Sequence, residues 1–208
     1  MEILNLFPTP VYKDIIAIPE SVDQHYQKER YARNNYNNGW MSKFNLHKDE
    51  KYKPLISIID EHVNKFCYDG LKIKKNLKTS CCGAWINLHK GNDWAQEHRH
   101  TNSMISGVVY LSAPPSSGSI TFHSDKQQTH MFGSFFDPTS YMEENQKLYQ
   151  PTKTIDVTTG MILLFPSTLL HSVSMNINKS IVRSSFSFDY MLVGTLSTFL
   201  NEIHVSVS

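Results

Sequence analysis

The sequence predicts a mainly β fold, a jelly roll with helices beside it, and three observations support that prediction. Short apolar or alternating runs follow one another from about residue 77 onward, separated by segments that contain glycine and proline. The first third of the chain instead holds one segment of clear helical period. With 208 residues and 40% hydrophobic content, the chain has the size of a single domain that buries a substantial core.

The first third is expected to be helical and extended. Residues 6–12 contain two prolines and no helical period, which favours an extended edge segment. Residues 19–33 are polar and favour a surface helix, with Ser21 as a candidate N-cap. Residues 34–45 are rich in asparagine and predict turns. In residues 52–66 the apolar side chains recur at helical spacing, which predicts the best-defined helix, packed on a sheet.

The remainder of the chain predicts a series of strands. Tight connections such as residues 113–118 and 158–160 indicate antiparallel neighbours, because they are short and rich in turn-forming residues. The long interval 126–153 is polar and aromatic without a clear period, and its length favours a functional lid over a site. The expected strands are residues 84–88, 103–111, 118–123, 154–157, 161–165 and 180–191.

Composition argues against several classes of protein. The formal net charge is +1, and the locally basic run at residues 71–78 stands alone, so nucleic acid is not an expected partner. No apolar stretch approaches the roughly 20 residues of a membrane span, and the first residues lack the pattern of a signal peptide. A cytoplasmic protein is therefore expected. The cysteines Cys67, Cys81 and Cys82 are then expected to be reduced packing residues.

Three histidines predict a metal site. His98 and His100 stand two residues apart, which in an extended segment places both imidazoles on one face. His171 follows a predicted strand much later in the sequence, and from there a third imidazole can complete a set of three ligands. The chain has 10 histidines, so such a pair can also arise by chance. The third histidine and the neighbouring anion site described next favour the metal.

Arg183 and Ser185 predict an anchor for a small carboxylate. They share one face of a predicted strand, and a guanidinium beside a hydroxyl offers several hydrogen bonds to a carboxylate. A charge among apolar strand residues is costly to bury without a partner. The structural alternative is an ion pair between Arg183 and a nearby Asp or Glu such as Asp189. Metal ligands combined with a carboxylate anchor are typical of an oxygenase.

A series of motifs extends these two features along the chain. In order they are Trp85-Ile86-Asn87, Gly91, His98-Arg99-His100, Ser106-Gly107, Tyr110-Leu111, Gly118 to Phe122, Gly160 to Pro166, His171-Ser172-Val173 and Arg183-Ser184-Ser185-Phe186. This series resembles the 2-oxoglutarate- and Fe(II)-dependent oxygenases, and more narrowly a bacterial and phage family related to prolyl 4-hydroxylases. Residues 6–12 and 39–42 also look like that narrower family.

The resemblance implies one domain spanning residues 1–208, with a helical and extended part up to about residue 76 and a core at about residues 77–195. The implied fold is a double-stranded β-helix, the cupin-like jelly roll. The implied cofactors are Fe(II) and 2-oxoglutarate, and the implied activity is hydroxylation of an unidentified substrate by dioxygen, with release of succinate and carbon dioxide. The implied catalytic and metal-binding residues are His98, His100 and His171, and the implied cosubstrate residues are Arg183, Ser185, Asn87 and Tyr110.

The sequence departs from the larger superfamily at one ligand. Members of that superfamily carry His-x-Asp or His-x-Glu, whereas this chain has a histidine at position 100. Three ligand sets follow: three histidines; one of His98 and His100 with Asn102 or a water; or a carboxylate reaching in from Glu97 or Asp93.

Other residues near these motifs suggest further contacts and a competing ligand pair. A literal His123-x-Asp125 exists, but it follows the strands that the first ligands should precede, so it is the less favoured pair. Ser103 and Ser106 are candidates for hydrogen bonds to the ligand histidines.

Two other functions compete with this interpretation. One is a non-catalytic jelly-roll module that binds a ligand or a protein, and the missing carboxylate ligand is its main support. The other is a cupin-like dioxygenase with three histidines and no cosubstrate, which the pair Arg183 and Ser185 argues against.

Overall fold

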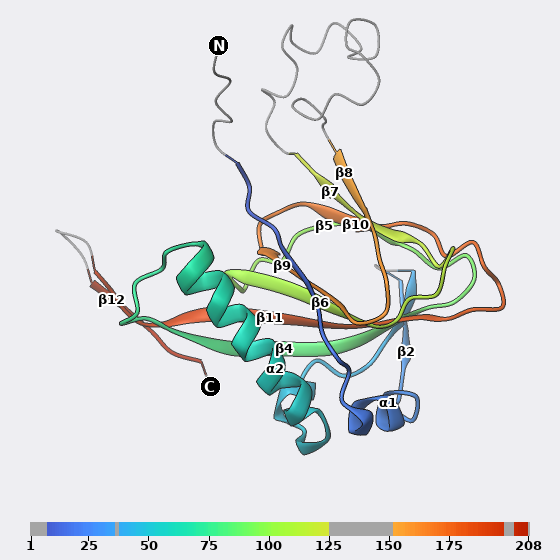
Figure 1. Cartoon of the computed structure of the whole chain (residues 1–208), viewed down its shortest axis with the longest axis horizontal. Coiled ribbons are helices and arrows are strands. Elements are labelled where there is room, and N and C mark those ends of the chain that lie inside the picture. The colour runs from blue at the N-terminus through green and yellow to red at the C-terminus, as the bar shows by residue number, and fades with distance from the viewer. Residues whose placement is uncertain (1–7, 36–37, 125–151, 198–201, 208) are drawn as a thin grey trace, which may run out of the picture.

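The computed structural model describes residues 8–35, 38–124, 152–197 and 202–207. Two antiparallel sheets face one another in the manner of a jelly roll, and the helices lie against the outer face of the larger sheet (Figure 1). This arrangement confirms the mainly β class with flanking helices. The interval 126–153, predicted as a lid, lies outside the described residues except for its last two positions.

The larger sheet has eight strands and provides one wall of the molecule. Its named strands pair in antiparallel fashion, and the long strand β11 forms its centre between β6 and β4. In spatial order the strands are β1 (Tyr12–Ile15), β9 (Met161–Pro166), β6 (Ile105–Ser112), β11 (Arg183–Ser197), β4 (Lys78–His89), β3 (Gly39–Met41) and β2 (Ala32–Asn34), with β12 (Glu202–Val205) paired to β11.

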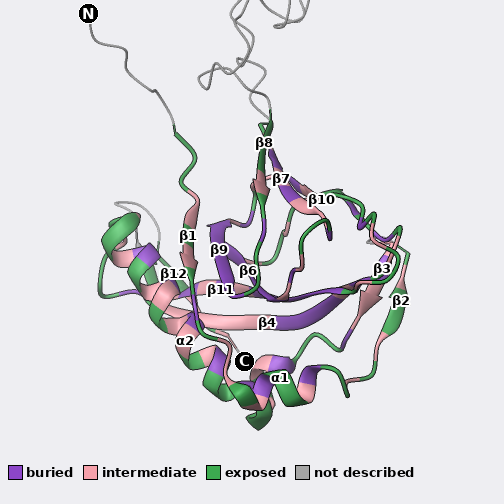
Figure 2. Cartoon of the chain, turned by 45° about the vertical axis from the view of Figure 1, so that its right-hand side comes forward, coloured by how far each residue is buried: buried purple, intermediate pink, exposed green. Residues whose placement is uncertain are grey.

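The smaller sheet has four strands and covers the inner face of the larger one. Its order is β5 (Ala95–His98), β10 (His171–Val173), β7 (Ser119–His123) and β8 (Thr152–Asp156). Burial follows position in the sheets, because β6 and β9 are almost wholly buried while the edge strands β1 and β8 carry exposed residues (Figure 2).

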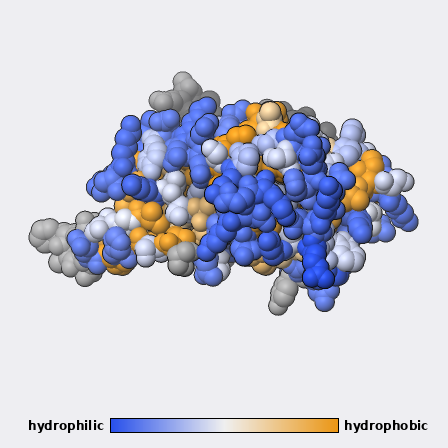
Figure 3. All heavy atoms as spheres, turned by 90° about the horizontal axis from the view of Figure 1, so that it is seen from below, coloured by the Kyte–Doolittle hydropathy of each residue, from blue (hydrophilic) through white to orange (hydrophobic). Residues whose placement is uncertain are grey.

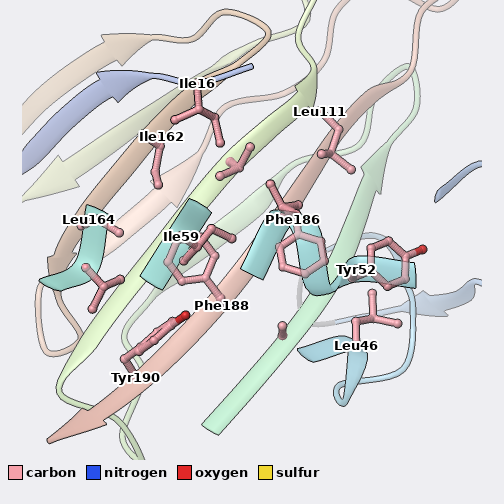
Figure 4. Packing of buried hydrophobic residues seen from close by; sticks show 14 of the residues in the cluster. Ile16, Leu46, Tyr52, Ile59, Leu111, Ile162, Leu164, Phe186, Phe188 and Tyr190 are labelled. Atoms are coloured by element: carbon pink, nitrogen blue, oxygen red, sulfur yellow. The ribbon is translucent and has the colours of Figure 1, made fainter. Parts of the chain in front are cut away.

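The main helix α2 (Lys53–Asn64) packs its apolar stripe on the outer face of the larger sheet, and the chain continues through η3 (Lys65–Gly70). Ile59 meets Phe186 and Phe188 of β11 there (Figure 4). Burial of each such side chain contributes about 1.5–3 kcal/mol. Because strand side chains alternate between faces, β11 turns Arg183, Ser185 and Ser187 toward the smaller sheet.

The other helical elements are short and lie before α2. They are α1 (Glu20–Tyr26), η1 (Leu46–Lys48) and η2 (Glu50–Tyr52). Viewed from below, the surface is mostly hydrophilic with smaller apolar patches (Figure 3). No helix in the described part of the chain is long and apolar enough to cross a membrane.

Several predicted elements need correction. The helix expected over residues 19–33 ends at Tyr26, and Pro19 rather than Ser21 is its N-cap. The turns expected over residues 34–45 include strand β3, which forms a hairpin with β2. The prediction missed the short strands β5 and β10. The helix expected over residues 52–66 is confirmed as α2 and the start of η3.

Candidate metal centre and anion pocket

The fold brings three imidazoles to one point. His98 ends β5 and lies directly opposite His171, the first residue of β10, in the antiparallel register. His100 follows β5, where its backbone N–H donates to the carbonyl of Ser167 at 2.9 Å. One potential ligand atom from each histidine lies within 4.8 Å of the others. The pair chosen from the sequence and the distant third histidine therefore meet.

Hydrogen bonds fix how these rings face the shared space. Nδ1 of His98 lies 2.8 Å from the carbonyl oxygen of Gln96, and Nδ1 of His171 lies 2.9 Å from that of Leu169. A carbonyl oxygen only accepts, so each Nδ1 carries the proton and donates it. The Nε2 lone pair of both rings is then free for a metal ion, which is the tautomer that a ligand histidine needs.

Burial keeps two of the rings neutral. Burial, with the neighbouring His98 as the next cause, lowers the pKa of His171 to about 3. Burial is also the main reason why the pKa of His98 lies below its ordinary value. A metal ligand must be deprotonated, so at neutral pH both rings are ready to bind a cation.

The third ring, His100, is held by a carboxylate. Its Nδ1 lies 2.7 Å from Oδ1 of Asp189 on β11, and Ser106 donates to the same oxygen at 2.6 Å. Ser106 therefore lies beside a candidate ligand, as the sequence suggested, with its Oγ 3.0 Å from His100 Nδ1. Ser103 instead donates to Ser167 at 2.8 Å.

Arg183 lies buried in the same cavity and is only 1% exposed. Its Nη1 donates to the carbonyl of Ser117 at 2.7 Å and its Nη2 to that of Ser174 at 3.5 Å. Gly118 packs against the guanidinium at φ +103°, and a Cβ there would overlap Nη1. Burial lowers the pKa of Arg183, and no carboxylate among the described residues pairs with it. The alternative ion pair with Asp189 is wrong, because that carboxylate binds His100.

One cavity between the two sheets joins the imidazoles to this guanidinium. Asn87 of β4 donates to Ser187 at 2.9 Å, and Tyr110 of β6 is buried, which raises the pKa of its phenol. Every site residue chosen from the sequence lines the cavity: His98, His100, His171, Arg183, Ser185, Asn87 and Tyr110. The arrangement has the chemistry of a cation site at one end and an anion site at the other.

A family model described as "Putative 2OG-Fe(II) oxygenase" matches residues 83–189, slightly more than half of the chain. The chain belongs to this family of 2-oxoglutarate- and Fe(II)-dependent oxygenases. The cofactor pair predicted from the sequence is the pair for which the family is named. A search of curated protein sequences gives no match to this chain.

Solved structures of other proteins share the fold. A prolyl 4-hydroxylase from Pseudomonas putida aligns with a TM-score of 0.58 at 13% identity, over 91% of this chain and 96% of that one. An oxidoreductase of the 2OG-Fe(II) oxygenase family from Burkholderia pseudomallei gives 0.57 at 11% identity, over 82% and 75%. HygX from Streptomyces hygroscopicus, solved with nickel and 2-oxoglutarate, gives 0.55 at 11% identity, over 88% and 83%. These likenesses show the double-stranded β-helix fold.

Asp93, Glu97 and His123, three of the other candidate ligands, have partners outside the histidine group. Asp93 pairs with Arg33 at 2.7 Å, and Glu97 lies 3.4 Å from Nδ1 of His123. Nε2 of His123 lies 2.8 Å from Oγ of Ser172. Asp125 lies outside the described residues. Within the described ranges, the three histidines form the one group of potential ligands that could hold a metal.

Sequence reasoning missed one residue that lines the oxygenase cavity and the contact that one carboxylate makes with a candidate ligand. His89, the last residue of β4, lines the cavity together with Asn87, and Asp189 holds one of its histidines. The alternation Trp85, Asn87, His89 along one strand face was the available signal for the first. The sequence did not indicate that Asp189 contacts His100. That contact depends on the packing of β11 against the segment that follows β5, which is a tertiary feature.

Proposed function

We propose that this oxygenase hydroxylates a substrate with dioxygen and 2-oxoglutarate, using Fe(II) bound by His98, His100 and His171, and releases succinate and carbon dioxide. One observation supports the proposal most. A single buried cavity has three imidazoles at one end and, at the other, a guanidinium that no described carboxylate neutralises. The first end fits a soft-to-borderline divalent metal ion, and the second fits the far carboxylate of a dicarboxylic acid.

The residues of the chain bind and orient the reactants. Arg183 and Ser185 hold the far carboxylate of 2-oxoglutarate, and Asn87 and Tyr110 supply further polar contacts along the cavity. The imidazoles of His98, His100 and His171 would hold the metal ion, and the keto-acid end of 2-oxoglutarate would lie toward it. The bound metal supplies the oxidation, in which one oxygen atom enters succinate, carbon dioxide leaves, and the other oxygen enters a C–H bond of the substrate.

The surroundings of the site serve this chemistry in two ways. Val108, Ile120 and Phe165 line the cavity and exclude water from it. The three imidazoles bring no negative charge of their own, and Asp189 places one directly behind His100. Other superfamily members use a carboxylate as a direct metal ligand. In this chain the carboxylate of Asp189 would instead act on the metal through its hydrogen bond to His100.

Succinate formation without a prime substrate tests the proposal. The purified chain, supplied with Fe(II), 2-oxoglutarate and air, should form succinate slowly, and His171→Ala should form none. The lack of a carboxylate in the described metal group favours a second candidate, a module that binds a ligand and does not catalyse. Absence of succinate from the wild-type chain, with metal binding intact, would favour that module.

A further inference from the structure

His89 is a buried histidine whose ring has no hydrogen-bond partner. It ends β4, directly opposite Arg183 of β11 in the antiparallel register, and is only 4% exposed. Both ring nitrogens are buried, and neither has a partner in the described structure. Each buried polar group left unsatisfied costs about 1–3 kcal/mol, so such a group calls for an explanation.

The ring lines the cavity, and its surroundings there are rich in donors. His89 shares the strand face of Asn87, but the amide of Asn87 already donates to Ser187. Burial, followed by the charges of Arg183 and Arg33, lowers the pKa of His89 to about 3, so the ring is neutral and has one N–H to donate. Arg33 is neutralised by Asp93, whereas Arg183 has no described carboxylate beside it. This end of the cavity therefore lacks an acceptor with negative charge.

We propose that His89 donates a hydrogen bond to the far carboxylate of the cosubstrate, beside Arg183, and is a cosubstrate-binding residue. This inference rests on the proposed function, because it assigns His89 to the same dicarboxylate. A carboxylate has about four acceptor positions, so it can take bonds from the guanidinium, from Ser185 and from His89 together. The free protein then carries an unsatisfied imidazole at a cost in stability, and the cosubstrate relieves that cost.

Removal of the ring should weaken 2-oxoglutarate binding without lowering the stability of the free protein. His89→Leu deletes both unsatisfied nitrogens, so the metal-free, ligand-free protein should unfold at the same or a higher temperature. The same variant should bind 2-oxoglutarate about 10- to 100-fold more weakly, the size of one hydrogen bond to a charged group. His89→Gln keeps an N–H donor and should recover most of that affinity. A residue with a structural role alone would lose stability instead.

The experiment uses the full chain loaded with Ni(II), which binds imidazoles without supporting turnover. Calorimetry measures the affinities for Ni(II) and for 2-oxoglutarate, and thermal unfolding is followed on the apo protein. His47→Leu is the matched control, because its Nδ1 is also buried without a partner but the residue lies outside the cavity. It should leave the 2-oxoglutarate affinity unchanged, and every variant should bind Ni(II) as the wild type does.

The outcomes separate this inference from the function on which it rests. If wild-type protein binds Ni(II) but not 2-oxoglutarate, the cosubstrate assignment fails and the inference fails with it. If wild type and His89→Leu bind 2-oxoglutarate equally, the inference alone fails. Loss of Ni(II) affinity and stability together with 2-oxoglutarate affinity in both His89 variants would also overturn it, since that pattern marks a structural residue.

Discussion

Replacing Asp189 by asparagine tests whether the carboxylate beside His100 strengthens metal binding at the proposed site. Asparagine keeps an oxygen that can accept from Nδ1 of His100, now 2.7 Å from the carboxylate, and it keeps the acceptor for Ser106. The substitution therefore removes mainly the negative charge. Loss of a partner behind a ligand histidine typically weakens metal binding about 10- to 100-fold. That range corresponds to about 1.4–2.8 kcal/mol of binding free energy.

The assay is an equilibrium competition for Co(II) between the protein and a coloured chelator, at fixed pH and salt. Asp93→Asn is the control, because Asp93 is likewise a carboxylate in an ion pair, but its partner is Arg33 and it lies outside the group of three histidines. It should leave the Co(II) affinity within about twofold of wild type. Equal affinity in Asp189→Asn and wild type would refute the reasoning, because the charge would then contribute nothing to the metal.

Three further predictions follow from the anion end of the cavity. Arg183→Met should raise the 2-oxoglutarate concentration needed for half-maximal succinate formation, by a factor equivalent to on the order of 2–5 kcal/mol. An unchanged concentration would show that Arg183 does not bind the cosubstrate. Gly118→Ala should weaken 2-oxoglutarate binding and lower the melting temperature, because a Cβ at φ +103° strains the backbone and displaces Nη1 of Arg183; calorimetry and thermal unfolding measure both. The buried ring of His89 has a pKa of about 3 in the folded protein and about 6.5 in the unfolded chain. As the pH falls from about 6.5 toward 3, the unfolded chain binds a proton that the folded protein does not, so this ring lowers the free energy of unfolding. The apo melting temperature of His89→Leu should therefore fall less steeply between pH 7 and 4 than that of wild type, and parallel curves would count against a neutral buried ring.

The strands of the larger sheet were predictable because their signal is local. Residues 161–165 and 180–191 are apolar or alternate, and they became β9 and most of β11. β5 and β10 have four and three residues, too few to show a period. Their pairing nevertheless places His98 opposite His171. The two strands that bring these histidines together are therefore the ones that sequence periodicity could not predict.

Strand geometry also explains why the alternative ion pair between Arg183 and Asp189 does not form. Arg183 and Asp189 have the same parity on β11 and so share the cavity-facing side, which made an ion pair plausible. At about 3.3 Å per residue, however, six residues place them about 20 Å apart. Arg183 lines the cavity at its anion end, whereas Asp189 contacts the ring of His100.

The central claim is that the three imidazoles hold the metal to which 2-oxoglutarate binds. Anaerobic addition of Fe(II) and 2-oxoglutarate to the wild-type chain, followed by visible absorption, tests it most directly. A weak charge-transfer band should appear, and it should be lost in His171→Ala and in the double variant His98→Ala/His100→Ala. No band in the intact protein, or an equal band in His171→Ala, would contradict the account.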